Sequence, residues 1–163
     1  MMQLTLQVEV TVGEALEQAI RSAAAAALGH QQITNPSALT ILLTDDDTLQ
    51  QLNRDYRQVD APTDVLSFPL DGDHPGQSVA YLGDMAISIP YATRQAQSEG
   101  HTLLAELQLL TVHGILHLLG YDHLEPDEKA EMWATQADIL HSLGAEITGP
   151  KEESEQLPVS SQQ

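Results

Sequence analysis

The sequence predicts a single α/β (α+β) domain in which a small mixed four-stranded sheet packs with about five helices. Its 163 residues suit one domain, and 42% of them are hydrophobic, which is enough to bury a core. Short segments of alternating or β-branched apolar residues are interspersed with longer segments of helical periodicity. The chain has no internal repeat, so we expect one layered unit with helices covering the sheet.

The first two elements are a strand at 4–10 and a helix at 13–28. Leucines and valines occupy every second position of the strand, which indicates one buried face. In the helix, apolar residues recur at intervals of three and four, and Gly29 is the expected stop.

A second strand at 38–43 leads into a second helix that continues to about Tyr56. The strand is apolar and β-branched, as buried strands usually are. Thr44 or Asp45 is the expected N-cap of the helix, because a short oxygen-bearing side chain accepts from its first free amides. The acidic residues 45–47 then fall in the first turn, where negative charge suits the helix dipole.

Two further strands are expected at 65–70 and 81–89. A break at 60–63 precedes the first, and a loop at 71–78, rich in glycine and proline, separates the two. Strands so close in sequence are expected to pair antiparallel.

Three helices complete the predicted domain, at 90–98, 102–119 and 126–143. From Gly149 the composition turns acidic and then rich in serine and glutamine, which is typical of a disordered tail. We therefore expect one domain over 1–148 and a tail over 149–163.

Composition limits the possible functions. Six basic residues against 24 acidic ones give a net charge of −18, so no basic patch for nucleic acid is expected, and partners with basic surfaces are favoured. The chain has no cysteine, so any metal must be held by His, Asp or Glu. Without disulfides, a leader or a long apolar run, the sequence predicts a soluble, cytoplasmic protein that does not bind membranes.

The segment from His113 to His123 carries the strongest chemical signal. His113 and His117 lie four residues apart on a predicted helix, so their rings are about 6 Å apart on one face. Gly120 can end that helix in a left-handed conformation, after which His123 can return to the same point. Three imidazoles with a fourth position open are how a catalytic zinc ion is held. We therefore predict one zinc ion, on a central helix and the turn after it.

A closed, structural zinc site would need a fourth protein ligand, and Asp122 is the one adjacent candidate. It would have to coordinate directly beside His123. The remaining histidines are expected to be surface residues or hydrogen-bonded core groups: His30, His74, His101 and His141.

The same spacing is similar to that of the metzincin proteases, H-E-x-x-H-x-x-G-x-x-H. Here Gly114 stands where those enzymes carry the glutamate that serves as general base. Met132, the downstream methionine, falls inside a predicted helix rather than in a turn. Peptide hydrolysis is therefore disfavoured.

A second segment, residues 53–69, reads NRDYRQVDAPTDVLSFP and runs from a helix end through a loop into a strand. With residues 82–88, which begin Leu-Gly-Asp, and the histidine segment 113–123, it resembles the YbeY family of bacterial rRNA maturation factors. The order of these segments extends the resemblance over about 4–145. It implies a metal-dependent endoribonuclease.

The resemblance assigns roles residue by residue. It implies that His113, His117 and His123 bind zinc and that Arg57 is the functional arginine of the cleft. It also implies cleavage of single-stranded RNA in rRNA precursors, maturation of the 16S rRNA 3′ end, ribosome quality control and association with the small ribosomal subunit. Because this chain is acidic, we also expect basic ribosomal proteins to bind it and bring it to its RNA substrate.

The chemistry of Arg57 fits a catalytic role, because a planar guanidinium can hold two oxygens of a reacting phosphodiester. The alternative is a salt bridge from Arg57 to Asp60 or Asp64 that ties the loop. Asp60, Asp64 and Asp84 can each orient a histidine or fix Arg57, but a structural role is favoured for all three. Packing roles are likewise expected for two aromatic residues of these motifs, Phe68 and Tyr121.

Two other functions stay open from the sequence. The charge of −18 and the missing general base suit a non-catalytic, zinc-containing ribosome-assembly factor. The histidine spacing alone leaves a zinc peptidase as the least favoured alternative.

Overall fold

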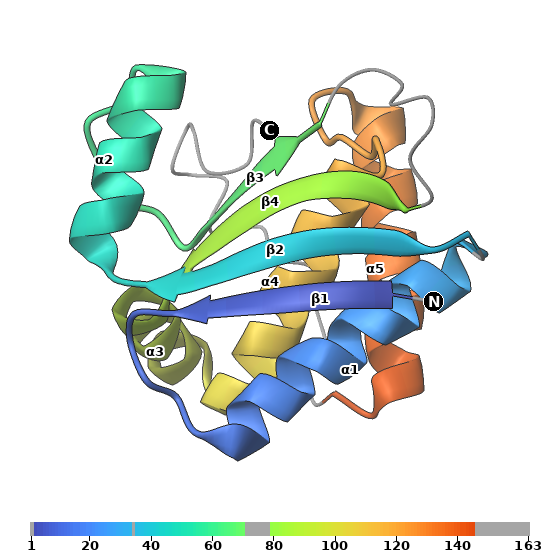
Figure 1. The fold of residues 1–163 in the computed structure, drawn as a ribbon, viewed down its shortest axis with the longest axis horizontal. Helices are drawn as coiled ribbons and strands as arrows, with labels where there is room; N and C mark the ends of the chain where they lie inside the picture. Colours follow the sequence, from blue (N-terminus) through green and yellow to red (C-terminus); the bar gives the residue numbers. More distant parts are fainter. Residues whose placement is uncertain (1, 34, 71–78, 146–163) are drawn as a thin grey trace.

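The computed structural model describes residues 2–33, 35–70 and 79–145, which form four strands and five helices (Figure 1). The strands are β1 (Met2–Val8), β2 (Ser37–Thr44), β3 (Val65–Pro69) and β4 (Ala80–Ser88). The helices are α1 (Glu14–His30), α2 (Asp46–Arg57), α3 (Ile89–Glu99), α4 (Leu103–Leu118) and α5 (Pro126–Leu143). This is the predicted order of elements.

The strands form one mixed sheet in the order β1-β2-β4-β3. β1, β2 and β4 are parallel to one another. β3 pairs antiparallel with β4, as predicted from the short sequence between these two strands. In the register of the last pair, Ser67 lies opposite Met85 and Phe68 opposite Asp84. The predicted mixed α/β fold with a small four-stranded sheet is confirmed.

Helices cover the two faces of the sheet unequally. In Figure 1, α1, α4 and α5 lie behind the sheet, while α2 stands beside the edge where β4 ends and β3 begins. The main core lies between the sheet and the first group of helices. A small second cluster on the other face joins Leu49 of α2 to Leu66 and Ala86. The helix α4 is buried from Ala105 to Leu118, so side chains on all its sides contact protein.

Side-chain caps begin the helices that carry the site. Of the two predicted caps of α2, Thr44 and Asp45, the structure has Asp45, which accepts a hydrogen bond from the amide of Thr48 at 3.0 Å. Thr102 accepts one from the amide of Ala105 at 3.0 Å and so begins α4. At the other end of α4, Gly120 has the predicted positive φ, +105°.

Most predicted boundaries differ from the structure by one or two residues, as the ends of the first strand and the first helix show. The first strand ends at Val8 because the amides of Glu9 and Val10 both donate to the carbonyl of Leu43, so the chain turns away from the ladder. The first helix passes through Gly29 and ends at His30. The predicted loop at 71–78 and tail at 149–163 lie outside the described residues.

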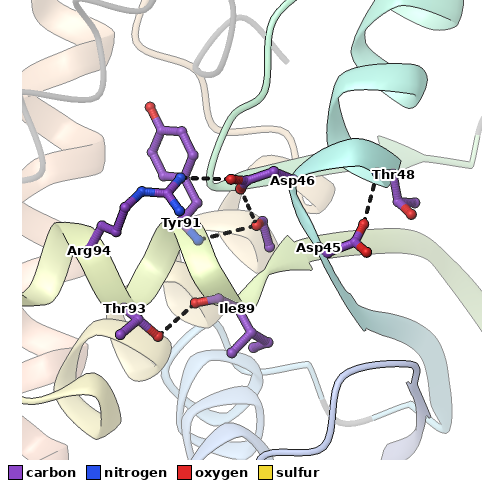
Figure 2. Close-up of polar contacts among 8 residues, drawn as sticks. Asp45, Asp46, Thr48, Ile89, Tyr91, Thr93 and Arg94 are labelled. Carbon is purple, nitrogen blue, oxygen red and sulfur yellow. Dashed lines mark hydrogen bonds and ion pairs between the residues drawn. The ribbon is translucent and has the colours of Figure 1, made fainter.

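A polar contact network joins the beginnings of α2 and α3 (Figure 2). The carboxylate of Asp46 accepts from Ser88 Oγ at 2.7 Å and from Arg94 at 2.8 Å. Ser88 in turn caps α3 by accepting from the amide of Tyr91 at 3.3 Å. These contacts fix the start of α2, the helix that carries Arg57 at its other end.

No helix of the described residues is long and apolar enough to cross a membrane.

Substitution of Gly83 by alanine is expected to destabilise the fold by about 2–4 kcal/mol. Gly83 has a φ of +140°, and a Cβ there would lie 2.4 Å from the backbone oxygen of Phe68. Chemical denaturation measures the loss. The same change at Gly100, where φ is +79° and no atom lies within 4 Å, is the matched control and should cost only about 1 kcal/mol. Equal losses at the two positions would contradict the predicted clash.

Candidate metal centre

Three histidines converge beside the end of α4. His113 and His117 lie one turn apart on α4, and the turn that begins at Gly120 returns the chain so that His123 faces them. Their ring centroids are 4.7, 5.1 and 5.5 Å apart, and one nitrogen of each ring lies within 4.8 Å of the others. All three side chains are buried. The residues that the sequence singled out as metal ligands therefore lie together.

Hydrogen bonds to Nδ1 orient two of the rings. The backbone carbonyl of Tyr121 lies 3.0 Å from Nδ1 of His117 and can only accept, so this nitrogen carries the proton. The lone pair of His117 is consequently on Nε2. Nδ1 of His113 lies 2.9 Å from Oε1 of Gln136, on α5. Partners of this kind are what metal-binding histidines usually have on their second nitrogen.

The buried Nε2 atom of His117 indicates that this group of residues fits a metal ion. Among the described residues it has no hydrogen-bond partner, although a buried polar atom without one is costly. Desolvation lowers the pKa of His117 from 6.5 to about 4, and the charges of His123 and Arg57 also lower it. The ring is therefore neutral at pH 7, the state in which imidazole binds a metal.

The cluster of candidate metal ligands has three members, the three histidines, rather than four. Asp122, the predicted candidate for a fourth ligand, accepts from the amide of His123 at 2.7 Å and does not belong to the group. No other His, Asp or Glu of the described residues joins the three. Three protein ligands with one position left over are typical of a catalytic zinc site, whereas structural sites use four.

Gly114 packs against the sheet and cannot be replaced by a larger residue without rearrangement. A Cβ there would lie 2.2 Å from Cε of Met85 and 3.0 Å from Oγ of Ser67. Ser67 also donates to the carbonyl of Gly114 at 3.1 Å, which holds β3 close to α4. A glutamate like that of the metzincins would require the side chain of Met85 to move.

Arg57 is the last residue of α2. Its charge is the smallest of the effects on the pKa of His117, so the guanidinium acts on that ring only weakly. Arg57 is partly buried, and desolvation lowers its own pKa from 12.5 to about 10, which leaves it positively charged at pH 7. Gln58 follows in a left-handed conformation, with φ +60°, and ends the helix.

The neighbouring arginines have other roles. Arg54 pairs with Asp60 at 3.3 Å, and Arg94 pairs with Asp46 at 2.8 Å. Asp60 also accepts from Gln50 at 2.8 Å, so this carboxylate joins α2 to the loop that follows it.

The two other predicted aspartates have structural contacts. Asp64 is buried, caps the start of β3 by accepting from the amide of Val65 at 2.7 Å, and accepts from Gln95 at 3.0 Å. Asp84 accepts from the hydroxyl of Tyr81. Because side chains alternate along a strand and Met85 faces α4, Asp84 lies on the opposite face of the sheet from the histidines.

The predicted packing roles of the two aromatic residues agree with their contacts. Phe68 belongs to the small core cluster under α2, and its ring meets that of Tyr56 edge to face at 5.4 Å. Tyr121 packs against the main core, and its hydroxyl donates to Gln31 at 2.9 Å.

The remaining histidines of the described residues lie elsewhere. His30 and His141 are exposed. His101 is in hydrogen-bond contact with the buried carboxylate of Glu106, which Gln95 also contacts at 2.6 Å. This contact couples the beginning of α4 to α3. His74 lies outside the described residues.

Sequence reasoning missed two residues of the centre, both on α5. The ring of Trp133 lies 5.1 Å from that of His123 and 5.6 Å from that of His113. Gln136 contacts His113 directly. A signal for Gln136 was present, since it is a polar residue on the apolar stripe that also contains Met132 and Leu140.

The metal-free protein is expected to lose stability as the pH falls from 6.5 to 4. The folded-state pKa of His117, about 4, lies below its ordinary value of 6.5, so the unfolded chain binds more protons in this interval. The contribution of His117 to the free energy of unfolding is complete above pH 6.5 and lost below pH 4. The difference is about 3 kcal/mol. Urea denaturation in a chelator measures it. The loss should be smaller in His117→Gln, and parallel profiles for the two proteins would contradict the assignment.

The fold and the site together define a class: an α/β protein with a buried three-histidine centre that can hold a metal ion. The family model described as endoribonuclease YbeY matches residues 4–144. The chain therefore belongs to the YbeY endoribonuclease family.

Individual relatives agree with this assignment. The chain is 46% identical over 147 residues to the endoribonuclease YbeY of Chloroflexus aurantiacus, covering 86% of this chain and 96% of that protein. It is 45% identical over 135 residues to that of Roseiflexus castenholzii, covering 80% and 85%. A solution structure of a Thermotoga maritima protein is similar at a TM-score of 0.59 and 26% identity, covering 93% of this chain and 99% of that one.

Proposed function

We propose that this protein is a zinc-dependent endoribonuclease with one metal ion, specific for single-stranded RNA and acting in rRNA processing. The observation that carries the proposal is the convergence of three buried histidines in a chain of this family, with the charge of Arg57 acting on one of them, His117. The expected substrates are rRNA precursors, with maturation of the 16S rRNA 3′ end and ribosome quality control as the roles. The cytoplasm is the corresponding location.

Each residue of the centre has a separate task. His113, His117 and His123 would hold the ion, with His117 kept neutral by burial and its lone pair on Nε2. When bound, zinc supplies a Lewis acid that polarises a phosphoryl oxygen and acidifies water near pH 7. Arg57 would bind the oxygens of the scissile phosphate and stabilise the negative charge that develops on them.

The net charge of −18 supports recruitment to the RNA by a partner protein rather than direct RNA binding in a basic groove. Among the described residues, Arg54 and Arg94 are already paired with aspartates. Basic ribosomal proteins of the small subunit are therefore the proposed partners, bound with salt-sensitive affinity.

Cleavage by metal-stripped and zinc-loaded protein tests the proposal. A precursor of the 16S rRNA 3′ end is offered as naked single strand, as a duplex of the same sequence, and within small-subunit particles. We expect cuts in the single-stranded RNA or in the particles, none in the duplex, loss with chelator and recovery with one equivalent of zinc. No cleavage of any form by the zinc-loaded protein would contradict an enzymatic function.

The same experiment distinguishes the proposed enzyme from a non-catalytic, zinc-containing ribosome-assembly factor, the alternative that the acidic charge favours. Zinc-loaded protein that binds small-subunit particles but cuts none of the RNAs would identify an assembly factor.

A further inference from the structure

We infer that Gln136 is a positioning residue for the metal centre, which fixes the proton of His113 on Nδ1 and thereby presents Nε2 to the ion. The inference rests on the proposed metal site. It adds a residue from α5 to a centre whose histidines come from α4 and the turn after it.

The contact joins two residues distant in sequence. Oε1 of Gln136 lies 2.9 Å from Nδ1 of His113, and both side chains are buried, at 1% and 3% exposure. A neutral imidazole has one N–H and one lone pair, so a partner that accepts at one nitrogen leaves the lone pair on the other. In the arrangement we infer, the Gln136 carbonyl oxygen accepts from Nδ1–H.

The corresponding contact of His117 supports this direction. There the acceptor is the backbone carbonyl of Tyr121, which cannot donate, so Nδ1 carries the proton. Two ligands on one helix that bind one ion through the same nitrogen require the same tautomer. Gln136 supplies for His113 what the backbone supplies for His117.

The burial of Gln136 also needs a reason. It lies between Met132 and Leu140 on the buried side of α5, where an apolar residue would pack without the cost of burying an amide. Its hydrogen bond to His113 offsets this cost. The position therefore suits an acceptor for a metal ligand better than it suits a packing residue.

Zinc affinity, measured by competition with a chromophoric chelator, tests the inference without reference to catalysis. Gln136→Met keeps the length of the side chain and removes the acceptor, and we expect it to weaken zinc binding about 10–100-fold. Gln136→Glu keeps an acceptor and should bind within a few-fold of wild type or more tightly. The fluorescence of Trp133, the one tryptophan of the chain, reports binding independently, since its ring lies 5.1 Å from His123.

Gln108→Met is the matched control. Gln108 is a second mostly buried glutamine, at 7% exposure, and it lies on the same helix as His113. Its replacement should leave zinc affinity unchanged. Equal losses in Gln136→Met and Gln136→Glu, or no loss in Gln136→Met, would overturn the inference. A wild-type protein that binds no zinc would instead overturn the proposed function.

A measurement on the wild-type protein keeps the inference testable if Gln136→Met does not fold. Nitrogen chemical shifts of the histidine rings in the metal-free protein distinguish the two tautomers. We expect His113 to carry its proton on Nδ1 at pH 7, like His117. Protonation of His113 on Nε2 would overturn the inference.

Discussion

Replacement of His117 by alanine is expected to abolish stoichiometric zinc binding and to lower RNA cleavage at least about a thousandfold. Loss of the Lewis acid removes several kcal/mol of transition-state stabilisation, and about 1.4 kcal/mol corresponds to a factor of ten in rate. Elemental analysis of the purified variant and single-turnover cleavage of single-stranded RNA measure the two effects. His117 is suited to this test because its neutral, desolvated ring has a buried Nε2 without a hydrogen-bond partner in the described residues.

The matched control for His117→Ala is His141→Ala, which removes an exposed histidine from α5. It should leave zinc content and cleavage unchanged. Circular dichroism must show that both variants are folded, since the change at His117 also opens a small cavity in a buried region. Cleavage that survives in a folded, zinc-free His117→Ala protein would refute the role of the metal and point to a contaminating nuclease.

The sequence alone was sufficient to predict the parts of the site that depend on local spacing. Two histidines four residues apart must share a helix face, and a glycine three residues later can end the helix and reverse the chain. The structure has this arrangement, with Gly120 at a φ of +105°. The antiparallel pairing of β3 with β4 was predictable for the same reason, because the two strands are close in sequence.

Contacts between distant segments could not be predicted in this way. Gln136 is 23 residues from His113, and Gln95 is 31 residues from Asp64. Nothing in the local pattern of either segment says which partner it will meet, because the packing of whole helices decides this. Boundaries were also displaced where backbone amides found other acceptors, as Glu9 and Val10 did at Leu43.

The tight packing around Gly114 separates this centre chemically from a peptidase centre. A side chain there would meet Met85 and Ser67, so a glutamate base at this position would require Met85 to move. The histidines can therefore share the metzincin spacing without sharing the metzincin mechanism. In the proposed function, which has no such base, charge stabilisation by Arg57 is then a larger part of what the protein itself would contribute to cleavage.

Replacement of Arg57 by alanine is accordingly expected to lower the rate of cleavage about 10²–10³-fold while zinc content stays at one equivalent. The partly desolvated guanidinium lies where its charge acts on His117, and it remains protonated because its pKa is about 10. Arg57→Lys keeps the charge but loses the two-pronged contact with phosphate oxygens, so it should recover only part of the rate. Single-turnover rates at saturating RNA separate this loss from weaker binding.

Arg54→Ala is the matched control for the Arg57 variants, because it removes the same side chain one turn earlier on α2. Arg54 is exposed and paired with Asp60 at 3.3 Å, and surface pairs of this kind contribute little to stability. Its loss should change the rate less than about threefold, since a screened surface charge stabilises a buried transition state poorly. If the two alanine variants lose activity equally, the effect is one of net charge, and the specific role of Arg57 is refuted. A large loss of rate in Arg57→Ala but not in Arg54→Ala, with partial recovery in Arg57→Lys, would support a guanidinium that contacts the reacting phosphate.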